Sequence, residues 1–355
     1  MTNPGTFRPG FTNPGTGWIM ILMFRHDALK LSAPIVAGLL GLSACSGSAA
    51  SKASGSTDDN KPSIVVGAYP FAYVASQVAG DMAEVTNLLA PGADGHDLEL
   101  TAKQVAQVGE ADLVVYQEHY QEAMDEAVEQ QSPGKVLETG SFLELLPRSG
   151  AGTHESEDDH DHESSSAEAS EDDHHHKDHD HGAYDPHVWL APTNVATIGD
   201  HVAKALGEID PGNADAYKAN AAALTEKMNA LDGSYETGLA TCEVTTFITN
   251  HAAFGYLANR YHLTQVGISG ISTEEEPSPA RIQEIHEIAK ANNVTTIFTE
   301  TAVSPKVAEA IAGDLGIQTA VLDPLETLSD QSAGSDYAEV MSSNLESLRS
   351  ANKCQ

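Results

Sequence analysis

The stretch SIVVGAYPFAYVASQVAG occupies residues 63–80. Its opening part, 63–69, is a short apolar run that predicts a buried strand, and residues 71–80 predict a helix. The same pair of elements recurs along the next part of the chain. Strands that alternate with helices of this length predict a parallel sheet with helices on its faces. Further strands are expected at 84–90, 112–116 and 135–139, and helices at 101–110 and 120–130.

The second half of the chain repeats this alternation. Strands are expected at 246–249, 264–268, 295–299 and 319–322, and helices at 253–261, 279–291, 305–315 and 336–350. Between the halves, residues 213–240 carry an apolar stripe at helical spacing, which predicts an amphipathic helix on the order of 40 Å long. The stripe consists of Tyr217, Leu224, Met228, Leu231, Tyr235 and Leu239. We therefore expect an α/β fold of two lobes, each a mainly parallel sheet flanked by helices, joined by one long rigid helix.

Length and charge narrow the possible functions. The chain has 355 residues, 18 Lys+Arg against 52 Asp+Glu, and a formal net charge of −34. The length suggests about two domains. Such an acidic chain would repel the phosphates of a nucleic acid, so nucleic-acid binding is not expected.

An export signal is predicted near the start of the chain. The apolar run 31–44 follows the basic residues Arg25 and Lys30, and it has the length of a signal-peptide core rather than of a membrane span. The run ends in Leu42-Ser43-Ala44-Cys45, which resembles the lipobox of bacterial lipoproteins. This resemblance implies cleavage before Cys45 and attachment of lipid to its sulfur. An uncleaved anchor helix is the alternative.

These features give a set of expected boundaries. Residues 1–44 are expected to be a signal peptide, with Met23 as a possible true start, and residues 45–61 a lipidated cysteine with a flexible tether. The N-terminal lobe is expected at 62–191, including a disordered loop at 153–182. A connecting helical segment follows at 192–241, and the C-terminal lobe occupies 242–355.

Two cysteines remain after export. An exported protein lies in an oxidising compartment, so we expect Cys242 and Cys354 to form a disulfide. Two buried free thiols are the alternative.

A segment rich in histidine and acid lies at residues 153–181. It holds half of the chain's 16 histidines, and it has too few apolar residues to form a core. Imidazole and carboxylate groups at this density suit zinc, copper or nickel, so auxiliary metal capture is expected. A charged linker without further function is the alternative. Its histidines are His154, His160, His162, His174, His175, His176, His179 and His181.

Four other residues lie in loops or at the ends of predicted strands. Ligands of open α/β sheets bind at the carboxyl ends of strands. Three imidazoles and one carboxylate form a donor set that fits tetrahedral zinc. The candidate ligands are His96, His187, His251 and Asp323.

The motifs around these residues resemble the metal-type solute-binding proteins of bacterial ABC transporters, and within them the zinc-uptake branch. The resemblance covers roughly residues 62–355. Its motifs are Pro-Gly-x-x-x-His at 91–96, Asp-Pro-His-x-Trp-Leu at 185–190, His-x-Ala-Phe-Gly-Tyr at 251–256, Phe-Thr-Glu-Thr around Glu300, and Leu-Asp-Pro at 322–324.

The resemblance implies that His96, His187 and His251 bind metal between two lobes, with Asp323 or water as the fourth ligand. Glu300 is expected to have a supporting or structural role. The manganese branch generally has Glu where this chain has His251, and imidazole suits zinc better than manganese. Gly95 stands where the family usually has proline, from which we expect a less rigid loop before His96.

The implied function is capture of Zn²⁺ and its delivery to an ABC permease, by a monomeric, lipid-anchored receptor on the extracytoplasmic face of a bacterial cell membrane. No catalysis is expected. A manganese or iron receptor of the same family is one alternative. A zinc-dependent hydrolase is the other, although no Glu or Asp lies beside the ligands in a recognised general-base motif.

Overall fold

The structure, a computed structural model, describes residues 61–131, 133–148, 183–273 and 276–355. The expected signal peptide, Cys45 with its tether, and the histidine-rich segment lie outside these residues. The described residues form one compact unit. Among the described helices, none has the length and hydropathy needed to cross a bilayer.

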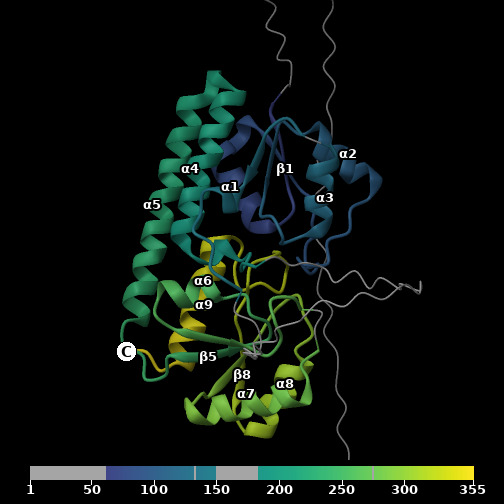
Figure 1. The fold of residues 1–355 in the computed structure, drawn as a ribbon. Helices are drawn as coiled ribbons and strands as arrows, with labels where there is room; N and C mark the ends of the chain where they lie inside the picture. The colour runs from purple at the N-terminus through teal and green to yellow at the C-terminus, as the bar shows by residue number, and fades with distance from the viewer. Residues whose placement is uncertain (1–60, 132, 149–182, 274–275) are drawn as a thin grey trace, which may run out of the picture. The chain divides into compact units, whose positions relative to one another are not determined.

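The N-terminal lobe is built on a four-stranded parallel sheet in the order β2-β1-β3-β4 (Figure 1). Val65 on the central strand β1 pairs with Thr86 on β2 and with Val114 on β3. Strand β3 is buried along its whole length, as expected for a parallel sheet covered on both faces. The strands are β1 (Ser63–Val66), β2 (Glu84–Asn87), β3 (Leu113–Tyr116) and β4 (Val136–Glu138).

Helices cover both faces of this sheet. One hydrophobic core joins the sheet to α1 (Tyr69–Ala79) and to the connecting helices. A second core lies between the sheet and the pair α2 (Ala102–Glu110) and α3 (Glu122–Gln131). Helix α2 begins at Thr101 with a capping box, in which the Thr101 side chain accepts from the Gln104 backbone and the Gln104 side chain accepts from Thr101 N–H. This reciprocal pair satisfies two backbone donors that a helix start leaves free.

The C-terminal lobe repeats the arrangement with a parallel sheet in the order β6-β5-β7-β8. Its strands are β5 (Thr246–Thr249), β6 (Thr264–Gly267), β7 (Thr296–Thr299) and β8 (Gln318–Val321). A separate core packs α7 (Pro279–Ala291) and α8 (Lys306–Leu315) on one face. Helices α6 (Gly255–Arg260) and α9 (Tyr337–Ala351) contribute to the large core on the other side. The two predicted α/β lobes with parallel sheets are confirmed.

Two helices, rather than one, form the connecting segment. Helix α4 (Pro192–Ile209) precedes the predicted long helix α5 (Ala214–Leu239), and the two run side by side along the lobes (Figure 1). The 26 residues of α5 span about 39 Å. This length lets α5 contact α1 in the first lobe and α9 in the second. The core that includes Phe71 and Tyr337 therefore continues from one lobe into the other.

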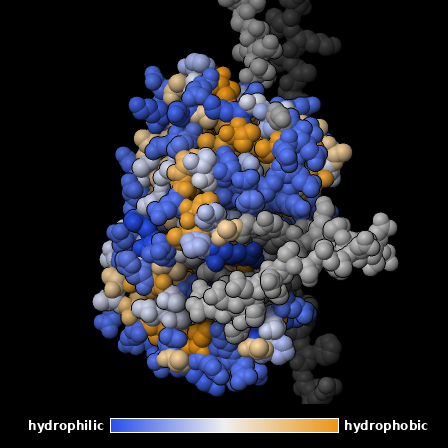
Figure 2. Space-filling model, in the orientation of Figure 1, coloured by the Kyte–Doolittle hydropathy of each residue, from blue (hydrophilic) through white to orange (hydrophobic). Residues whose placement is uncertain are grey.

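The remaining short elements are 3-10 turns, η1 (Gly80–Met82), η2 (Thr139–Ser141), η3 (Val188–Leu190) and η4 (Pro211–Asn213). A disulfide joins Cys242, just after α5, to Cys354 near the end of the chain. Hydrophilic residues cover most of the face shown in Figure 2. Among the described residues only Val136, Tyr184, Val307 and Val321 are large, hydrophobic and exposed.

Candidate metal centre

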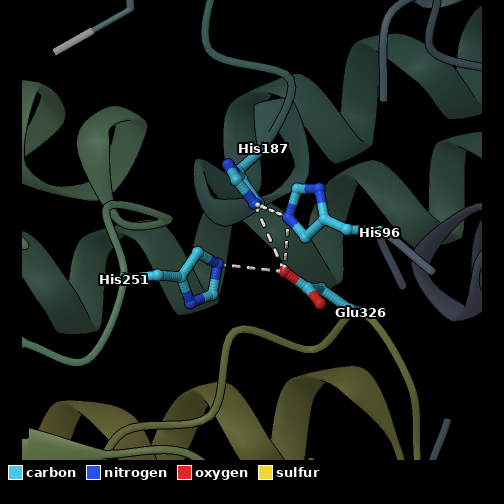
Figure 3. A group of neighbouring side chains, drawn as sticks. All are labelled: His96, His187, His251 and Glu326. Carbon is cyan, nitrogen blue, oxygen red and sulfur yellow. Dashed lines mark hydrogen bonds and ion pairs between the residues drawn. The ribbon is translucent and has the colours of Figure 1, made fainter. Parts of the chain in front are cut away.

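Four side chains from distant parts of the chain meet between the two sheets: His96, His187, His251 and Glu326 (Figure 3). One ligand atom from each lies within 4.8 Å of the others. Oε1 of Glu326 lies 3.4 Å from His96 Nε2, 3.2 Å from His187 Nε2 and 3.2 Å from His251 Nε2. The Nε2 atoms of His96 and His187 are 3.2 Å apart.

The loop that follows β2 supplies His96. The side-chain amide of Gln121 donates to the carbonyl oxygens of Gly67 and Gly95, and so ties this loop to the end of β1. Oδ1 of Asp94 accepts from the backbone N–H of His96 at 3.0 Å. Both ends of the peptide group between Gly95 and His96 are therefore hydrogen-bonded, which fixes the backbone on the N-terminal side of the ligand.

Gly95 fits this loop because no side chain would fit there. A Cβ at this position would lie 1.9 Å from the hydroxyl oxygen of Tyr120 and 3.0 Å from Cβ of Glu326. The ring of Tyr120 packs edge-on against the His96 ring. The loop packs closely against Tyr120 and Glu326, which line the centre. That glycine in place of proline makes this loop less rigid stays a prediction.

His187 comes just before η3, in the segment that returns to the first lobe. Oδ1 of Asp185 accepts from the His187 backbone N–H at 2.9 Å and lies 2.7 Å from His187 Nδ1. The Tyr256 hydroxyl donates to the Asp185 carbonyl and accepts from Leu146 N–H. Tyr256 belongs to the second lobe, so this segment is held from both lobes.

His251 follows strand β5 after one intervening residue. Oε1 of Glu300, which directly follows β7, accepts from the His251 backbone N–H at 3.1 Å and lies 2.7 Å from His251 Nδ1. Because β5 and β7 are neighbours in a parallel sheet, their carboxyl ends place these two residues side by side.

The turn after β8 presents Glu326. Oδ1 of Asp323 accepts from Leu325 N–H at 2.8 Å, and Thr301 donates to Asp323 Oδ2. Leu325 has a φ of 60°, an uncommon conformation for a branched residue. The Asp323 side chain stabilises this turn by bonding its own backbone two residues on, and the turn directs Glu326 toward the histidines.

The separations of Glu326 Oε1 from the three imidazole nitrogens match those in a tetrahedral zinc site, and all four atoms lie within 4.8 Å of one another. Zinc–nitrogen and zinc–oxygen bonds of about 2.0–2.1 Å at tetrahedral angles place neighbouring ligand atoms about 3.3 Å apart. The observed separations to Glu326 are 3.2–3.4 Å.

The protonation pattern also favours a cation at the centre. A carboxylate only accepts hydrogen bonds, so Nδ1 of His187 and Nδ1 of His251 carry the hydrogen that Asp185 and Glu300 accept. The Nε2 atoms of both rings then point at Glu326, where each can bind either a proton or a metal ion (Figure 3). Nε2 of His251 belongs to a fully buried side chain and lies 3.2 Å from Oε1 of Glu326.

Charges near these groups shift their pKa values strongly. Burial disfavours the charged ring, but the hydrogen bonds to Asp185 and Glu326 outweigh it and raise the pKa of His187 above 6.5. Burial is likewise outweighed at His251, whose pKa the Glu300 carboxylate raises well above its usual value. Burial would raise the pKa of Glu326, but His96 and the two other imidazoles hold it well below 4.5. The centre therefore stabilises positive charge, as protons or as a metal ion.

Some of the predicted ligands lie in the cluster and one does not. The three histidines come together, and Glu300 lies behind His251. Asp323 does not join the cluster, because its carboxylate is used in the turn before Glu326. Glu326 was not among the predicted ligands. It lies two positions beyond the Leu-Asp-Pro motif, where neither a strand end nor a helical spacing marks it.

A family model described as ZnuA, zinc-uptake complex component A, periplasmic, matches residues 64–351 of the chain. The chain belongs to this family. The zinc-binding lipoprotein AdcA of Streptococcus pneumoniae is 37% identical over 297 residues, which cover 82% of this chain and 56% of that protein. The high-affinity zinc uptake system protein ZnuA of Bacillus subtilis is 34% identical over 317 residues, covering 89% of this chain and 95% of that protein.

The chain spans a little over half the length of the AdcA relatives. The fold of the ZnuA family extends through the described residues: the zinc(II)-bound ZnuA-like domain of Streptococcus pneumoniae AdcA superposes with a TM-score of 0.65 at 32% identity. That match covers 82% of this chain and 99% of the domain. The expected similarity to zinc-type solute-binding proteins is confirmed.

Proposed function

We propose that this ZnuA-family chain is an extracytoplasmic zinc receptor, which holds one Zn²⁺ between its lobes through His96, His187, His251 and Glu326. The observation that carries the proposal is the set of four buried donor atoms at tetrahedral spacing. The zinc-binding names of the relatives support the same cargo.

The donor set favours zinc over manganese. Three imidazoles and one carboxylate give a nitrogen-rich site with close spacing, whereas manganese prefers oxygen ligands in a larger coordination shell. Asp185 and Glu300 hold two of the rings with Nε2 facing inward. Such supporting hydrogen bonds orient metal-binding histidines and raise their basicity.

The role is transport rather than catalysis. Four protein donors fill a tetrahedral shell and leave no position for a reactive water, whereas catalytic zinc keeps one position open. The ion is cargo, and an ABC permease in the membrane is its recipient. We also propose the expected monomer.

The parts outside the described residues complete the proposal. Residues 1–44 would direct export, Cys45 would carry lipid, and residues 46–61 would tether the receptor beside its permease. Tethering raises the effective concentration of one partner near the other. Residues 153–181 would collect zinc near the tighter centre. The lobes would comprise 62–191 and 242–355, with 192–241 between them.

Metal content of the purified full chain tests the central claim. After dialysis against a weak chelator that strips loosely held metal, we expect one zinc per chain, and a loss of that zinc in His187→Ala. Equal affinity for Mn²⁺ in a competition titration would contradict the zinc assignment. His251→Glu should move the preference toward Mn²⁺, since it replaces imidazole with carboxylate.

Deleting residues 153–181 tests the auxiliary role separately. The tightly held zinc should remain, while uptake at low external zinc should fall in cells that carry the deletion. Unchanged uptake and unchanged total metal would remove the capture role without affecting the buried centre.

A further inference from the structure

The loop 90–96 carries the donor His96 and also lines a surface cleft. Of the four donors, His96 has the most exposed side chain, at 5%, against 0%, 0% and 3% for the others. A cleft of about 850 Å³ opens outside the loop, lined by Pro91 and Gly92 on one side and by residues within 328–335 on the other. The loop therefore reaches from the centre, at His96, to this cleft, at Pro91 and Gly92.

Thr327 of the second lobe holds one end of this loop. The backbone N–H of Gly92 donates to the Thr327 hydroxyl at 2.8 Å, and the same hydroxyl lies 3.5 Å from the Ala90 carbonyl oxygen. Thr327 is 4% exposed and directly follows the donor Glu326. One side chain therefore connects the backbone next to one metal donor with the loop that carries another.

Thr273 of the second lobe holds the other end of the loop. The Thr273 hydroxyl donates to Oδ2 of Asp94 at 2.6 Å. The other oxygen of the same carboxylate accepts from His96 N–H. Asp94 thereby links the second lobe to the backbone of a metal donor.

We propose that Thr273 and Thr327 are positioning residues that latch the 90–96 loop to the second lobe and set the rate at which zinc leaves the centre. The inference rests on the proposed zinc site. Both latches cross between lobes and both end on the loop of His96, so opening the loop requires both bonds to break. Neither side chain touches the metal, so their loss leaves the donor set intact.

Zinc release from the full chain into excess EDTA, followed by stopped flow, tests the latches. Thr327→Val removes a neutral hydrogen bond and should raise the release rate about 5-fold, and Thr273→Val removes a bond to a carboxylate and should raise it about 10-fold. The double variant should reach about 50-fold if the two latches act independently. All variants retain residues 149–182, so zinc held there contributes equally to every trace.

Three control variants distinguish loss of a latch hydrogen bond from general destabilisation of the fold. Thr273→Ser and Thr327→Ser keep the hydroxyl and should release zinc at the wild-type rate. Thr295→Val is the matched control, because the Thr295 hydroxyl donates to the Ala351 carbonyl within the second lobe. Any of three results would overturn the proposal. The double variant could release zinc at the wild-type rate, or Thr295→Val could accelerate release as much as the latch variants do. The third is a lower zinc stoichiometry at an unchanged release rate.

Hydrogen exchange of the metal-free chain tests the latches without zinc. The Gly92 amide should exchange about 10-fold faster in Thr327→Val, because its acceptor is gone, while amides of β1 and β5 should keep their wild-type rates. Unchanged exchange at Gly92 would overturn the latch. If the wild-type chain bound no zinc, the proposed function would fail, and this measurement would still decide whether the threonines hold the loop.

Discussion

The Nδ1 atom of His251 lies 2.7 Å from Oε1 of Glu300, and both side chains are buried. The same oxygen also accepts from the His251 backbone N–H. One carboxylate therefore fixes the backbone, the ring orientation and the tautomer of a metal donor at once. Asp185 makes the same pair of contacts with His187, so two of the three imidazoles are oriented in the same way from opposite lobes.

Glu300→Gln should weaken zinc binding by about 10–100-fold, the usual effect of losing a hydrogen-bonded support behind a metal ligand. The amide keeps the shape of the side chain but removes the charge that holds hydrogen on Nδ1. Isothermal titration with a competing chelator measures the change. Glu287→Gln on the exposed face of α7 is the matched control, and an equal effect there would contradict the supporting role of Glu300.

Substitution of Glu326 should lower zinc affinity much more than substitution of Asp323. Glu326→Gln removes a charged donor and should cost more affinity than the roughly 10–100-fold expected for a supporting group. Asp323→Asn should cost far less, since its amide oxygen can still accept from Leu325 N–H and the carboxyl carries a pKa already raised by burial. Zinc affinities of the two variants, measured side by side, decide between them. A larger loss in Asp323→Asn would restore Asp323 as the fourth ligand.

Zinc affinity should rise with pH. The pKa values of His187 and His251 are raised above 6.5, so the metal-free centre holds protons that zinc must displace. For the metal-free protein, the stabilisation from these histidines is complete below pH 6.5 and is lost as pH rises through their raised pKa values. Zinc binding should therefore release about one to two protons near neutral pH. Calorimetry in buffers of different ionisation enthalpy counts these protons, and a count of zero would contradict a protonated centre.

Loss of the disulfide should destabilise the fold without changing the metal centre. The bond between Cys242 and Cys354 closes a loop of 112 residues, and a bond of this kind contributes about 2–5 kcal/mol. The double variant Cys242→Ser with Cys354→Ser should unfold at a lower temperature in a calorimetric scan. Its zinc stoichiometry should stay at one. Two reactive thiols in the unreduced wild-type chain would instead indicate that the cysteines are free.

Local residue patterns were enough to predict the alternation of strands and helices. Strand β5 and helix α7 begin and end where they were predicted. The residues of β5 are β-branched or aromatic, which favours a strand, and Ser278-Pro279 is a strong helix start. The same alternation placed His96 and His251 in loops at the carboxyl ends of strands. Helix α4 was not separated from the connecting segment, since only the stripe of α5 was used to find a helix there.

Contacts between segments far apart in the chain determine which carboxylate faces the histidines. Asp323 and Glu326 are three residues apart in one irregular turn, and neither position has a periodicity that reveals its direction. The choice depends on the left-handed backbone conformation of Leu325 and on the hydrogen bond from Leu325 N–H to the Asp323 carboxylate. It also depends on Trp189 of the first lobe, whose indole N–H donates to the Pro324 carbonyl. Local sequence sets elements through short-range hydrogen bonds and burial, whereas the direction of a side chain in a turn depends on contacts with residues more than a hundred positions away.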